Sequence, residues 1–259
     1  MRILLTNDDG ITSRGLFEAK LALDAVGEVS VIAPDANRSG VGRGITIHRS
    51  LHVAEVELRD GTIGYATDGT PVDCVRFADL GLVGERPDLI VSGINYGYNL
   101  GDDVTYSGTV AAAFEGILLG IPGIAISQGS PTATADFRRH EAYDFTAAAA
   151  LLPRLVGEVE RRGLPGGTIL NVNVPSQPAG ATVARLGKRI YRDRLDVESD
   201  QEGRRRYRIY GVDPSYHDEP GTDFRAIAEQ RISITPIHLD LTSAGGLEEV
   251  AAWDLEGVV

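Results

Sequence analysis

Two adjacent carboxylates, Asp8 and Asp9, directly follow the first apolar segment of the chain, Met1 to Leu5. That segment is too short for a helix and has the apolar character of a buried parallel strand. Open α/β sheets bind their ligands at the carboxyl ends of strands, which is where this pair would lie. Because two like charges so close together repel each other, the pair favours a cation between them. The alternative is that Asp9 only caps the helix that follows.

Two further loops offer oxygen atoms of the kind that a hard cation binds. Ser39 lies in the loop after a predicted strand at 29–33, and Asn95 lies in the loop after a predicted strand at 88–92. If the three strands are parallel neighbours, the three loops open on one edge of the sheet. Carboxylate, hydroxyl and amide oxygens suit Mg²⁺, Mn²⁺ or Ca²⁺ better than zinc. Ser39 and Asn95 each also stabilise tight turns without a ligand, but the three loops together indicate a metal site.

A Gly- and Asn-rich segment at 92–101 leads towards Ser107, Gly108 and Thr109, which open an Ala-rich helix. The glycines allow the backbone to curl closely around a ligand. The free amides at a helix N-terminus lie at the positive end of the helix dipole, so they predict an anion site suited to a phosphoryl group. Asn99 is a further candidate phosphate ligand. The alternative is an N-cap at Ser107 preceded by a flexible loop. The segment matches neither a Walker loop nor a dinucleotide fingerprint.

Strand-like and helix-like patterns alternate over the first two thirds of the chain. We expect strands at 2–6, 29–33, 51–58, 64–67, 88–92, 123–127 and 168–172. We expect helices at 13–25, 71–80, 109–119 and 139–162, with Gly120 as the C-cap of the third. This alternation predicts an α/β fold with a Rossmann-like, doubly wound and mostly parallel sheet.

The pattern changes after about Arg185, where residues 188–210 are dense in Arg, Asp and Tyr. Two partly alternating strands around an exposed turn at 203–206 predict a hairpin. Because a hairpin that packs only on itself is marginally stable, we expect it to project onto another subunit, with a surface loop as the alternative. A short helix at 222–229, a strand at 232–236 and a terminal helix at 247–255 complete the predicted elements.

Composition excludes several classes of protein. A hydrophobic fraction of 42% and a charged fraction of 24% are those of a soluble globular protein. The net charge of −12 argues against a nucleic-acid polymer as partner, and an anionic substrate would need local positive charge. Cys74 is the only cysteine, which excludes an internal disulfide, and the five histidines lack metal-ligand spacing. The absence of a signal peptide and of a membrane-spanning segment predicts a cytoplasmic protein without a membrane partner.

Taken together, these segments resemble the survival protein E (SurE) family of metal-dependent nucleotide phosphatases. The matching stretches span nearly the whole chain in the family's order: NDDG at 7–10, NRSG at 37–40, DGTPVDCV at 68–75, SGINYGYNLGDDVTYSGTVAAAFEG at 92–116 and TDFRAIAEQRISITPIHLDLT at 222–242. The long match at 92–116 is highly specific, whereas either four-residue motif alone would be weak. The chain departs from the family at 41–44, where Val-Gly-Arg-Gly replaces a stretch that tends to carry Ser or Asn.

The resemblance implies an enzyme, a 5′-nucleotidase that also removes phosphate from nucleoside 3′-monophosphates, with short polyphosphate as a further candidate substrate. It implies one divalent cation per subunit, Mg²⁺ or Mn²⁺ with Ca²⁺ as a third candidate, held by Asp8, Asp9, Ser39 and Asn95. It also implies a homodimer or homotetramer. The expected organisation is a Rossmann-like catalytic domain at 1–185, a projecting hairpin and exchanged segment used in oligomerisation at 186–235, and a C-terminal helix and tail at 236–259.

The resulting hypothesis is hydrolysis by water that the metal activates, with Asp8 as the catalytic carboxylate that also orients or deprotonates this water. Ser107, Gly108 and Thr109, with Asn99, would bind the phosphate. An aspartyl-phosphate route ranks low, because Asn7 occupies the position that would carry the nucleophile. Two alternatives from other classes are a non-catalytic nucleotide-binding module with a structural ion, and a pure interaction protein that uses the segment at 188–210.

Overall fold

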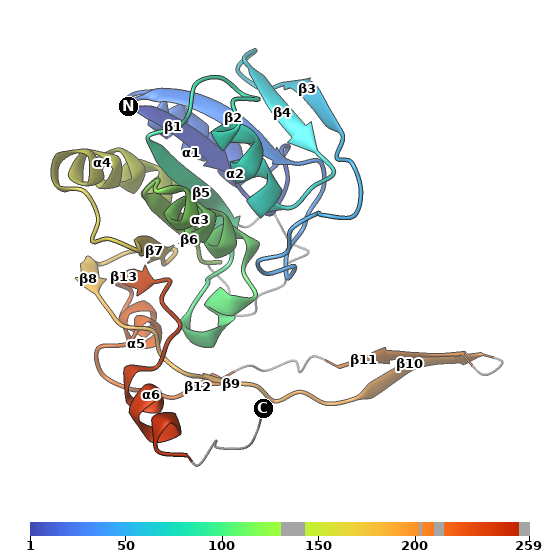
Figure 1. Ribbon diagram of the computed structural model, residues 1–259, viewed down its shortest axis with the longest axis vertical. Coiled ribbons are helices and arrows are strands. Elements are labelled where there is room, and N and C mark those ends of the chain that lie inside the picture. The colour runs from blue at the N-terminus through green and yellow to red at the C-terminus, as the bar shows by residue number, and fades with distance from the viewer. Residues whose placement is uncertain (131–142, 202–203, 210–214, 254–259) are drawn as a thin grey trace.

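The structure, a computed structural model, describes residues 1–130, 143–201, 204–209 and 215–253. Within these residues a nine-stranded sheet forms the centre of the molecule, in the order β3-β4-β2-β1-β5-β6-β7-β13-β8 (Figure 1). Its strands are β1 Arg2–Thr6, β2 Glu28–Pro34, β3 Val53–Glu57, β4 Ile63–Thr67, β5 Leu89–Tyr96, β6 Gly123–Gln128, β7 Thr168–Val174, β8 Ala181–Val183 and β13 Ile232–His238.

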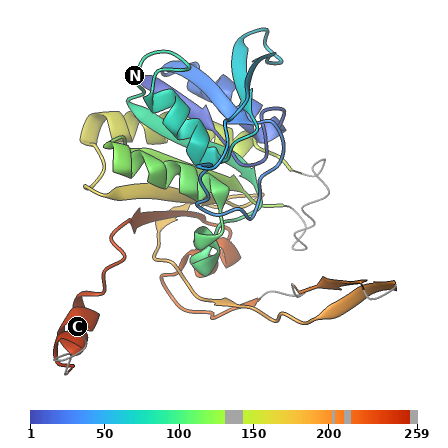
Figure 2. The same ribbon diagram turned by 45° about the vertical axis from the view of Figure 1, so that its right-hand side comes forward.

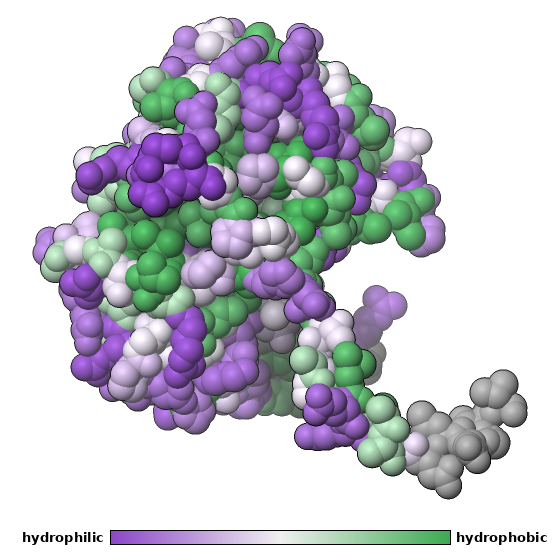
Figure 3. Space-filling view, turned by 60° about the vertical axis from the view of Figure 1, so that its left-hand side comes forward, coloured by the Kyte–Doolittle hydropathy of each residue, from purple (hydrophilic) through white to green (hydrophobic). Residues whose placement is uncertain are grey.

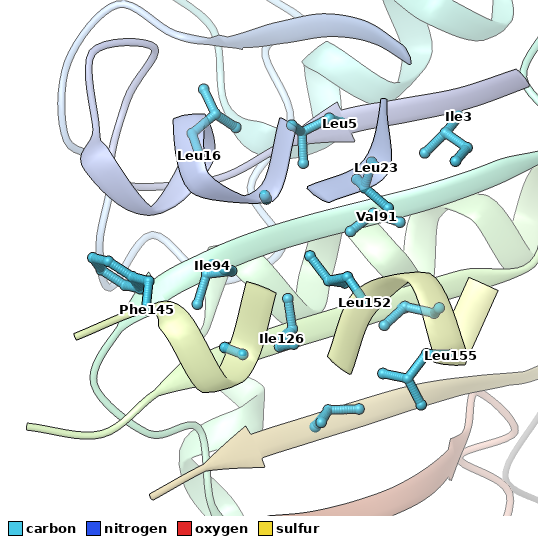
Figure 4. Close-up of a cluster of buried hydrophobic side chains, with 14 of the residues drawn as sticks. Ile3, Leu5, Leu16, Leu23, Val91, Ile94, Ile126, Phe145, Leu152 and Leu155 are labelled. Atoms are coloured by element: carbon cyan, nitrogen blue, oxygen red, sulfur yellow. The ribbon is translucent and has the colours of Figure 1, made fainter. Parts of the chain in front are cut away.

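Four long helices cover the two faces of this sheet, which confirms the predicted doubly wound α/β fold. Helices α1 (Arg14–Leu23) and α4 (Thr146–Arg162) pack against one face, and α2 (Pro71–Asp79) and α3 (Gly108–Leu119) pack against the other. Figure 4 shows Leu16 and Leu23 of α1 and Leu152 and Leu155 of α4 directed into the apolar layer between these helices and the sheet. Burying such side chains supplies the main favourable term in folding.

The three strands that precede the candidate ligand loops are neighbours in the sheet, as the sequence predicts. β1 pairs in parallel with β2 on one side and with β5 on the other. β5 continues the parallel part of the sheet through β6 and β7, whereas β13 is antiparallel to β7 and β3 is antiparallel to β4. The chain segments after β1, β2 and β5 therefore emerge on the same edge.

Helix ends follow local signals in the sequence. Ser13 and Ser107 are the N-caps of α1 and α3, and each side-chain oxygen accepts a hydrogen bond from the amide three residues later. Thr70 and Asp73 form a capping box at the start of α2, whose first residue is Pro71. Gly120 ends α3 in the left-handed region with φ of 71°, which confirms its prediction as the C-cap.

The predicted end of β5 and the predicted start of α4 are wrong. β5 continues to Tyr96 and includes residues 93–95, which we expected in a loop, because β5 resumes its pairing with β6 at Asn95 after a register shift. α4 begins at Thr146 rather than at residue 139, and residues 139–142 lie outside the described part of the chain. The Asp144 carboxylate accepts hydrogen bonds from the amide and the hydroxyl of Thr146, and it thereby stabilises a turn instead of the predicted helix.

The second half of the chain forms a projecting arm and then returns to the sheet. β9 (Arg189–Ile190) pairs with β12 (Ser215–Tyr216) at the root of the arm, and β10 (Asp196–Gln201) pairs with β11 (Arg204–Arg208) further out. The views in Figures 1 and 2 both show this hairpin extending away from the sheet, which confirms the predicted hairpin. The predicted turn at 203–206 is wrong, because residues 204–206 belong to β11 and pair with β10. Helix α5 (Asp223–Ala228) then precedes β13, and α6 (Ala244–Ala251) begins three residues earlier than the predicted terminal helix.

None of the described helices is both long enough and apolar enough to cross a lipid bilayer.

Candidate active site

The turn after β1 is held by Asn7, a residue that the sequence analysis considered only as a poor nucleophile. The Asn7 amide nitrogen donates to the Gly10 carbonyl (3.1 Å) and to the Ser13 hydroxyl (2.9 Å), and its amide oxygen accepts from the Gly10 amide (3.1 Å). Gly10 has a φ of +103°, which side chains rarely allow. A buried asparagine that closes the turn on itself therefore leaves the two following carboxylates free for other partners.

Asp8 is almost fully buried and faces the N-terminus of α3. The Thr109 hydroxyl donates to Oδ1 of Asp8 at 2.5 Å, and the amides of Gly108 and Thr109 also donate to the carboxylate. A Cβ atom on Gly108 would lie 2.7 Å from Cβ of Asp8, so only glycine permits this approach. Burial raises the pKa of Asp8, and the donors from α3 partly offset that rise. The sequence indicated both groups but not their contact.

Asp9 lies beside Asp8 and contacts two other elements. Its Oδ2 accepts a hydrogen bond from the Tyr96 amide (3.2 Å), and its Oδ1 accepts one from the Asn37 side chain (3.4 Å). Burial, followed by the nearby charge of Asp8, raises the pKa of Asp9 to about 8. The alternative role of Asp9 as a helix cap is wrong, because Ser13 caps α1.

Two backbone hydrogen bonds attach the loop after β2 to the elements of the site. The Arg38 amide donates to the Asp8 carbonyl (2.7 Å), and the Gly42 amide donates to the Tyr106 carbonyl (3.0 Å), next to the α3 N-terminus. Ser39 lies between these points and is exposed. The Ser39 amide donates to the Asn37 side chain at 2.8 Å, which is the turn chemistry that the sequence analysis offered as an alternative.

Asn95 is buried within β5, one residue before the Tyr96 amide that contacts Asp9. Its side-chain nitrogen donates to the Gly97 carbonyl at 2.9 Å, which orients the amide group. Among the contacts of the described residues, the side chains of Ser39 and Asn95 make no hydrogen bond to Asp8 or Asp9. The metal-ligand roles of Ser39 and Asn95 therefore stay predictions.

The predicted phosphate ligands fall into two groups. Ser107 caps α3 by accepting from the Val110 amide at 3.1 Å, so the N-cap interpretation is correct, and Gly108 and Thr109 already donate to Asp8. Asn99 is held by other elements: its side chain donates to Ser127 at the end of β6 (3.0 Å), and its amide donates to Asn173 of β7 (2.8 Å). A role of these residues in phosphate binding stays a prediction.

Tyr96 contributes its backbone to the site, whereas its ring packs in an aromatic cluster. The ring centroids of Tyr143 and Phe145 each lie 5.1 Å from that of Tyr96 in edge-to-face geometry. The Tyr96 ring is only 7% exposed. The Tyr96 ring is therefore part of the packed interior in this structure.

The donor set fits a hard divalent cation. Asp8 is buried and Asp9 beside it is partly buried, and within the described part of the chain no Lys, Arg or His forms a salt bridge with either of them. No cluster of three or more His, Cys, Asp or Glu residues that could hold a metal occurs among the described residues. A cation bound at Asp8 and Asp9 would therefore take its other ligands from hydroxyl, amide and water oxygens, as Mg²⁺ and Mn²⁺ commonly do.

The raised pKa of Asp9 predicts how the stability of the metal-free protein depends on pH. The folded state retains a proton on this carboxyl up to about pH 8, whereas the unfolded chain releases it near about pH 4. Stability should therefore fall as the pH rises through this window, because the unfolded state loses its proton first. A divalent cation takes the place of the proton and should raise the melting temperature by about 4 °C or more at pH 8, but little at about pH 5.

Thermal unfolding with EDTA and with Mn²⁺ at the two pH values measures this effect. Asp9→Asn should reduce both the pH dependence and the Mn²⁺ stabilisation, since the asparagine has no proton to exchange, whereas the raised pKa of Asp8 should leave part of the pH dependence in place. An Mn²⁺ stabilisation of equal size at both pH values would contradict the prediction.

Comparison with known proteins places this site in a family. The family model described as "Survival protein SurE" matches residues 3–193. A protein of Rubrobacter xylanophilus called 5′-nucleotidase SurE is 54% identical, with 100% of this chain and 99% of that protein covered. A protein of the same name from Chloroflexus aggregans is 47% identical, with 99% and 100% covered. The crystal structure of the SurE protein from Aquifex aeolicus superimposes with a TM-score of 0.78 at 37% identity, covering 96% of this chain and 98% of that one.

The family model covers the segments that carry the paired carboxylates and the N-terminus of α3, and the relatives match over nearly the whole chain. The chain belongs to the SurE family.

Proposed function

We propose that this protein is a 5′-nucleotidase, a phosphomonoesterase that removes phosphate from nucleoside 5′-monophosphates and also from nucleoside 3′-monophosphates. One observation carries the proposal: the buried Asp8 carboxylate at the end of β1, with Asp9 beside it, lies against the N-terminus of α3, where an anionic substrate can bind. The name 5′-nucleotidase that full-length relatives bear supports the choice of substrate. Short polyphosphate is a further candidate substrate.

Asp8, Asp9, Ser39 and Asn95 would hold one divalent cation per subunit, Mg²⁺ or Mn²⁺. When bound, the cation offsets negative charge on the phosphoryl oxygens and lowers the pKa of water. The β1 turn and the loop after β2 support this assignment, because both carry their oxygen atoms to one edge of the sheet.

Asp8 would orient the attacking water and accept its proton. The hydrogen bond from the Thr109 hydroxyl, at 2.5 Å, fixes the orientation of the Asp8 carboxylate in advance of the reaction. Ser107, Gly108 and Thr109, with Asn99, would donate hydrogen bonds to the phosphoryl oxygens. Gly108 and Thr109 would share their donors between Asp8 and the phosphoryl group, and the positive end of the α3 dipole would help to stabilise the charge that develops during phosphoryl transfer.

We also propose that the protein self-associates, as a homodimer or a homotetramer, and acts in the cytoplasm. Helix α6 contains no buried residue, and its Leu247 is 61% exposed, close to the exposed Trp253. Figure 3 shows hydrophobic and hydrophilic residues side by side on the part of the surface that projects from the body of the molecule. Leu195 and Val197 of the arm are also more than half exposed, and association would bury such side chains.

Release of inorganic phosphate from a panel of nucleoside 5′- and 3′-monophosphates tests the proposed activity. We expect EDTA to abolish release, and Mn²⁺ or Mg²⁺ to restore it, because the paired carboxylates need a cation to bind an anionic substrate. A protein that binds nucleotide but releases no phosphate with either ion would instead be a non-catalytic binding module. Turnover that persists in EDTA would contradict the metal dependence.

A further inference from the structure

Asp223 is a fully buried carboxylate outside the site described above, in the matching stretch at 222–242. Its Oδ2 accepts a hydrogen bond from the Gly101 amide (2.7 Å), and its Oδ1 accepts from the amides of Gly187 (2.8 Å) and Phe224 (2.9 Å). Gly101 and Gly187 are 86 positions apart in the chain and belong to different parts of the fold. One side chain therefore joins two segments that have no sequence proximity.

The two glycines pack so closely around Asp223 that neither tolerates a side chain. A Cβ atom on Gly101 would lie 2.5 Å from the Phe224 ring and 2.7 Å from the Gly187 carbonyl. A Cβ atom on Gly187 would lie 2.6 Å from the same ring. The position of the Gly101 backbone is thus tied to that of Gly187 by contact as well as by hydrogen bonds.

Gly187 begins the root of the arm, and further contacts attach this root to the short 3₁₀ helix η1 (Gly101–Thr105). Asp102 accepts from the Arg189 amide (3.0 Å), and Asp103 accepts from the Arg189 guanidinium and from the Tyr191 hydroxyl (3.0 Å). The guanidinium also lies 4.7 Å from the centroid of the Phe224 ring. The arm root, α5 and η1 therefore form one packed unit.

The chain on either side of η1 carries the proposed phosphate ligands: Asn99 lies two residues before Gly101, and Ser107 lies two residues after Thr105. We propose that Asp223 is a positioning residue, which sets the place of the phosphate-binding segment at 99–107 according to the position of the arm root. The inference rests on the proposed function and extends it. If the arm contacts a second copy of the chain, as proposed, association and phosphate affinity are coupled through Asp223.

Asp223→Asn should break the hydrogen bond to Gly101 while it keeps the hydrogen bond to Gly187. The asparagine oxygen can keep the bonds from Gly187 and Phe224, but its NH₂ group then faces the Gly101 amide, donor against donor. We expect the KM for nucleoside monophosphate and the inhibition constant for inorganic phosphate to rise together by about tenfold, with a smaller change in kcat. The Mn²⁺ concentration for half-maximal activity should stay the same, because the hydrogen bonds of Asp223 in the described structure go to Gly101, Gly187 and Phe224 and not to Asp8 or Asp9.

The split between KM and kcat distinguishes positioning from a loss of folded protein, which would lower kcat without raising KM. The matched control is Glu219→Gln, which removes an exposed carboxylate of the same region that pairs with Arg185 and should change neither constant. Gly187→Ala changes the root of the arm instead of Asp223, because its added methyl group would displace the Phe224 ring that also packs against Gly101. It should also weaken phosphate binding, although it alters no residue of the site.

A phosphorus NMR titration with inorganic phosphate and Mg²⁺ keeps the test independent of turnover. Wild-type protein that binds phosphate but hydrolyses no nucleotide would refute the proposed function, and the binding comparison would still decide the role of Asp223. Unchanged phosphate binding in folded Asp223→Asn overturns the inference. If that variant does not fold, unchanged binding in Gly187→Ala overturns it, and so does a wild-type protein that binds no phosphate.

Discussion

Asp8→Asn is expected to lower kcat for nucleoside monophosphate hydrolysis by about a thousandfold or more, with Mn²⁺ present in excess. The substitution removes both a charged cation ligand and the base that we assign to the attacking water. The hydrogen bond from Thr109 to this carboxylate, at 2.5 Å, should be retained by an asparagine oxygen, so the loss is chemical and not steric. Steady-state kinetics with a phosphate-release assay measure it.

Comparison with Asp9→Asn separates the proposed role of Asp8 as the base from its role as a cation ligand. Asp9 accepts hydrogen bonds from Tyr96 and Asn37 and has no contact with the α3 N-terminus among those described. Its loss should therefore mainly weaken cation binding, and raising the Mn²⁺ concentration should restore much of the activity. Asp79→Asn, which alters an ion pair with Arg86, is the neutral control. Full activity of Asp8→Asn, or its recovery at high Mn²⁺, would contradict the catalytic assignment.

Gly108→Ala is expected to lower kcat/KM by about a hundredfold or more, although the residue has no side chain to contribute. The new Cβ atom would lie 2.7 Å from Cβ and 2.9 Å from Oδ2 of Asp8, and 3.1 Å from Pro71. Either the carboxylate or the N-terminus of α3 must move, and a displacement of about 1 Å in an active site can cost about a hundredfold in rate. Kinetics of the folded variant measure the effect.

The same substitution should favour the helix itself, because alanine has a higher helix propensity than glycine. A loss of activity therefore cannot be attributed to a weaker helix. Alanine is favoured over glycine in a helix interior by about 1 kcal/mol, although this gain is smaller for Gly108, which is the first residue of α3. Gly157→Ala in α4 is the matched control, because no atom lies within 4 Å of its added Cβ. It should leave kcat/KM unchanged. Near-normal activity of Gly108→Ala would show that the contact between Asp8 and α3 is not needed for catalysis.

Local chemistry explains why the main elements could be predicted from the sequence. The caps of α1, α2 and α3 are formed by Ser13, Thr70 and Ser107, whose hydrogen bonds span only three residues. Apolar runs such as that of β1 must be buried on both faces, and this requirement leads to a parallel sheet between two helical layers. The shared edge of β2, β1 and β5 follows from the same alternation.

The boundaries that were wrong depend on distant contacts. Residues 93–95 have turn-forming composition, yet they belong to β5, because β6 offers hydrogen-bonding partners that local sequence does not reveal. The start of α4 moved because the Asp144 side chain competes for the Thr146 amide, while the neighbouring rings of Tyr143 and Phe145 are buried in the aromatic cluster. Tertiary packing overrode a helical pattern at this point.

The sequence by itself determined the α/β fold, the capped ends of α1, α2 and α3, the hairpin and the types of oxygen ligand, since each follows from hydrogen bonds or burial over a few residues. Only the tertiary structure decided that Asp8 contacts Thr109, 101 residues further along the chain, and that Asp223 holds Gly101 across 122 residues. Such contacts depend on how whole elements pack, and the energy of one hydrogen bond, about 1 kcal/mol, is too small to leave a local signal in the sequence.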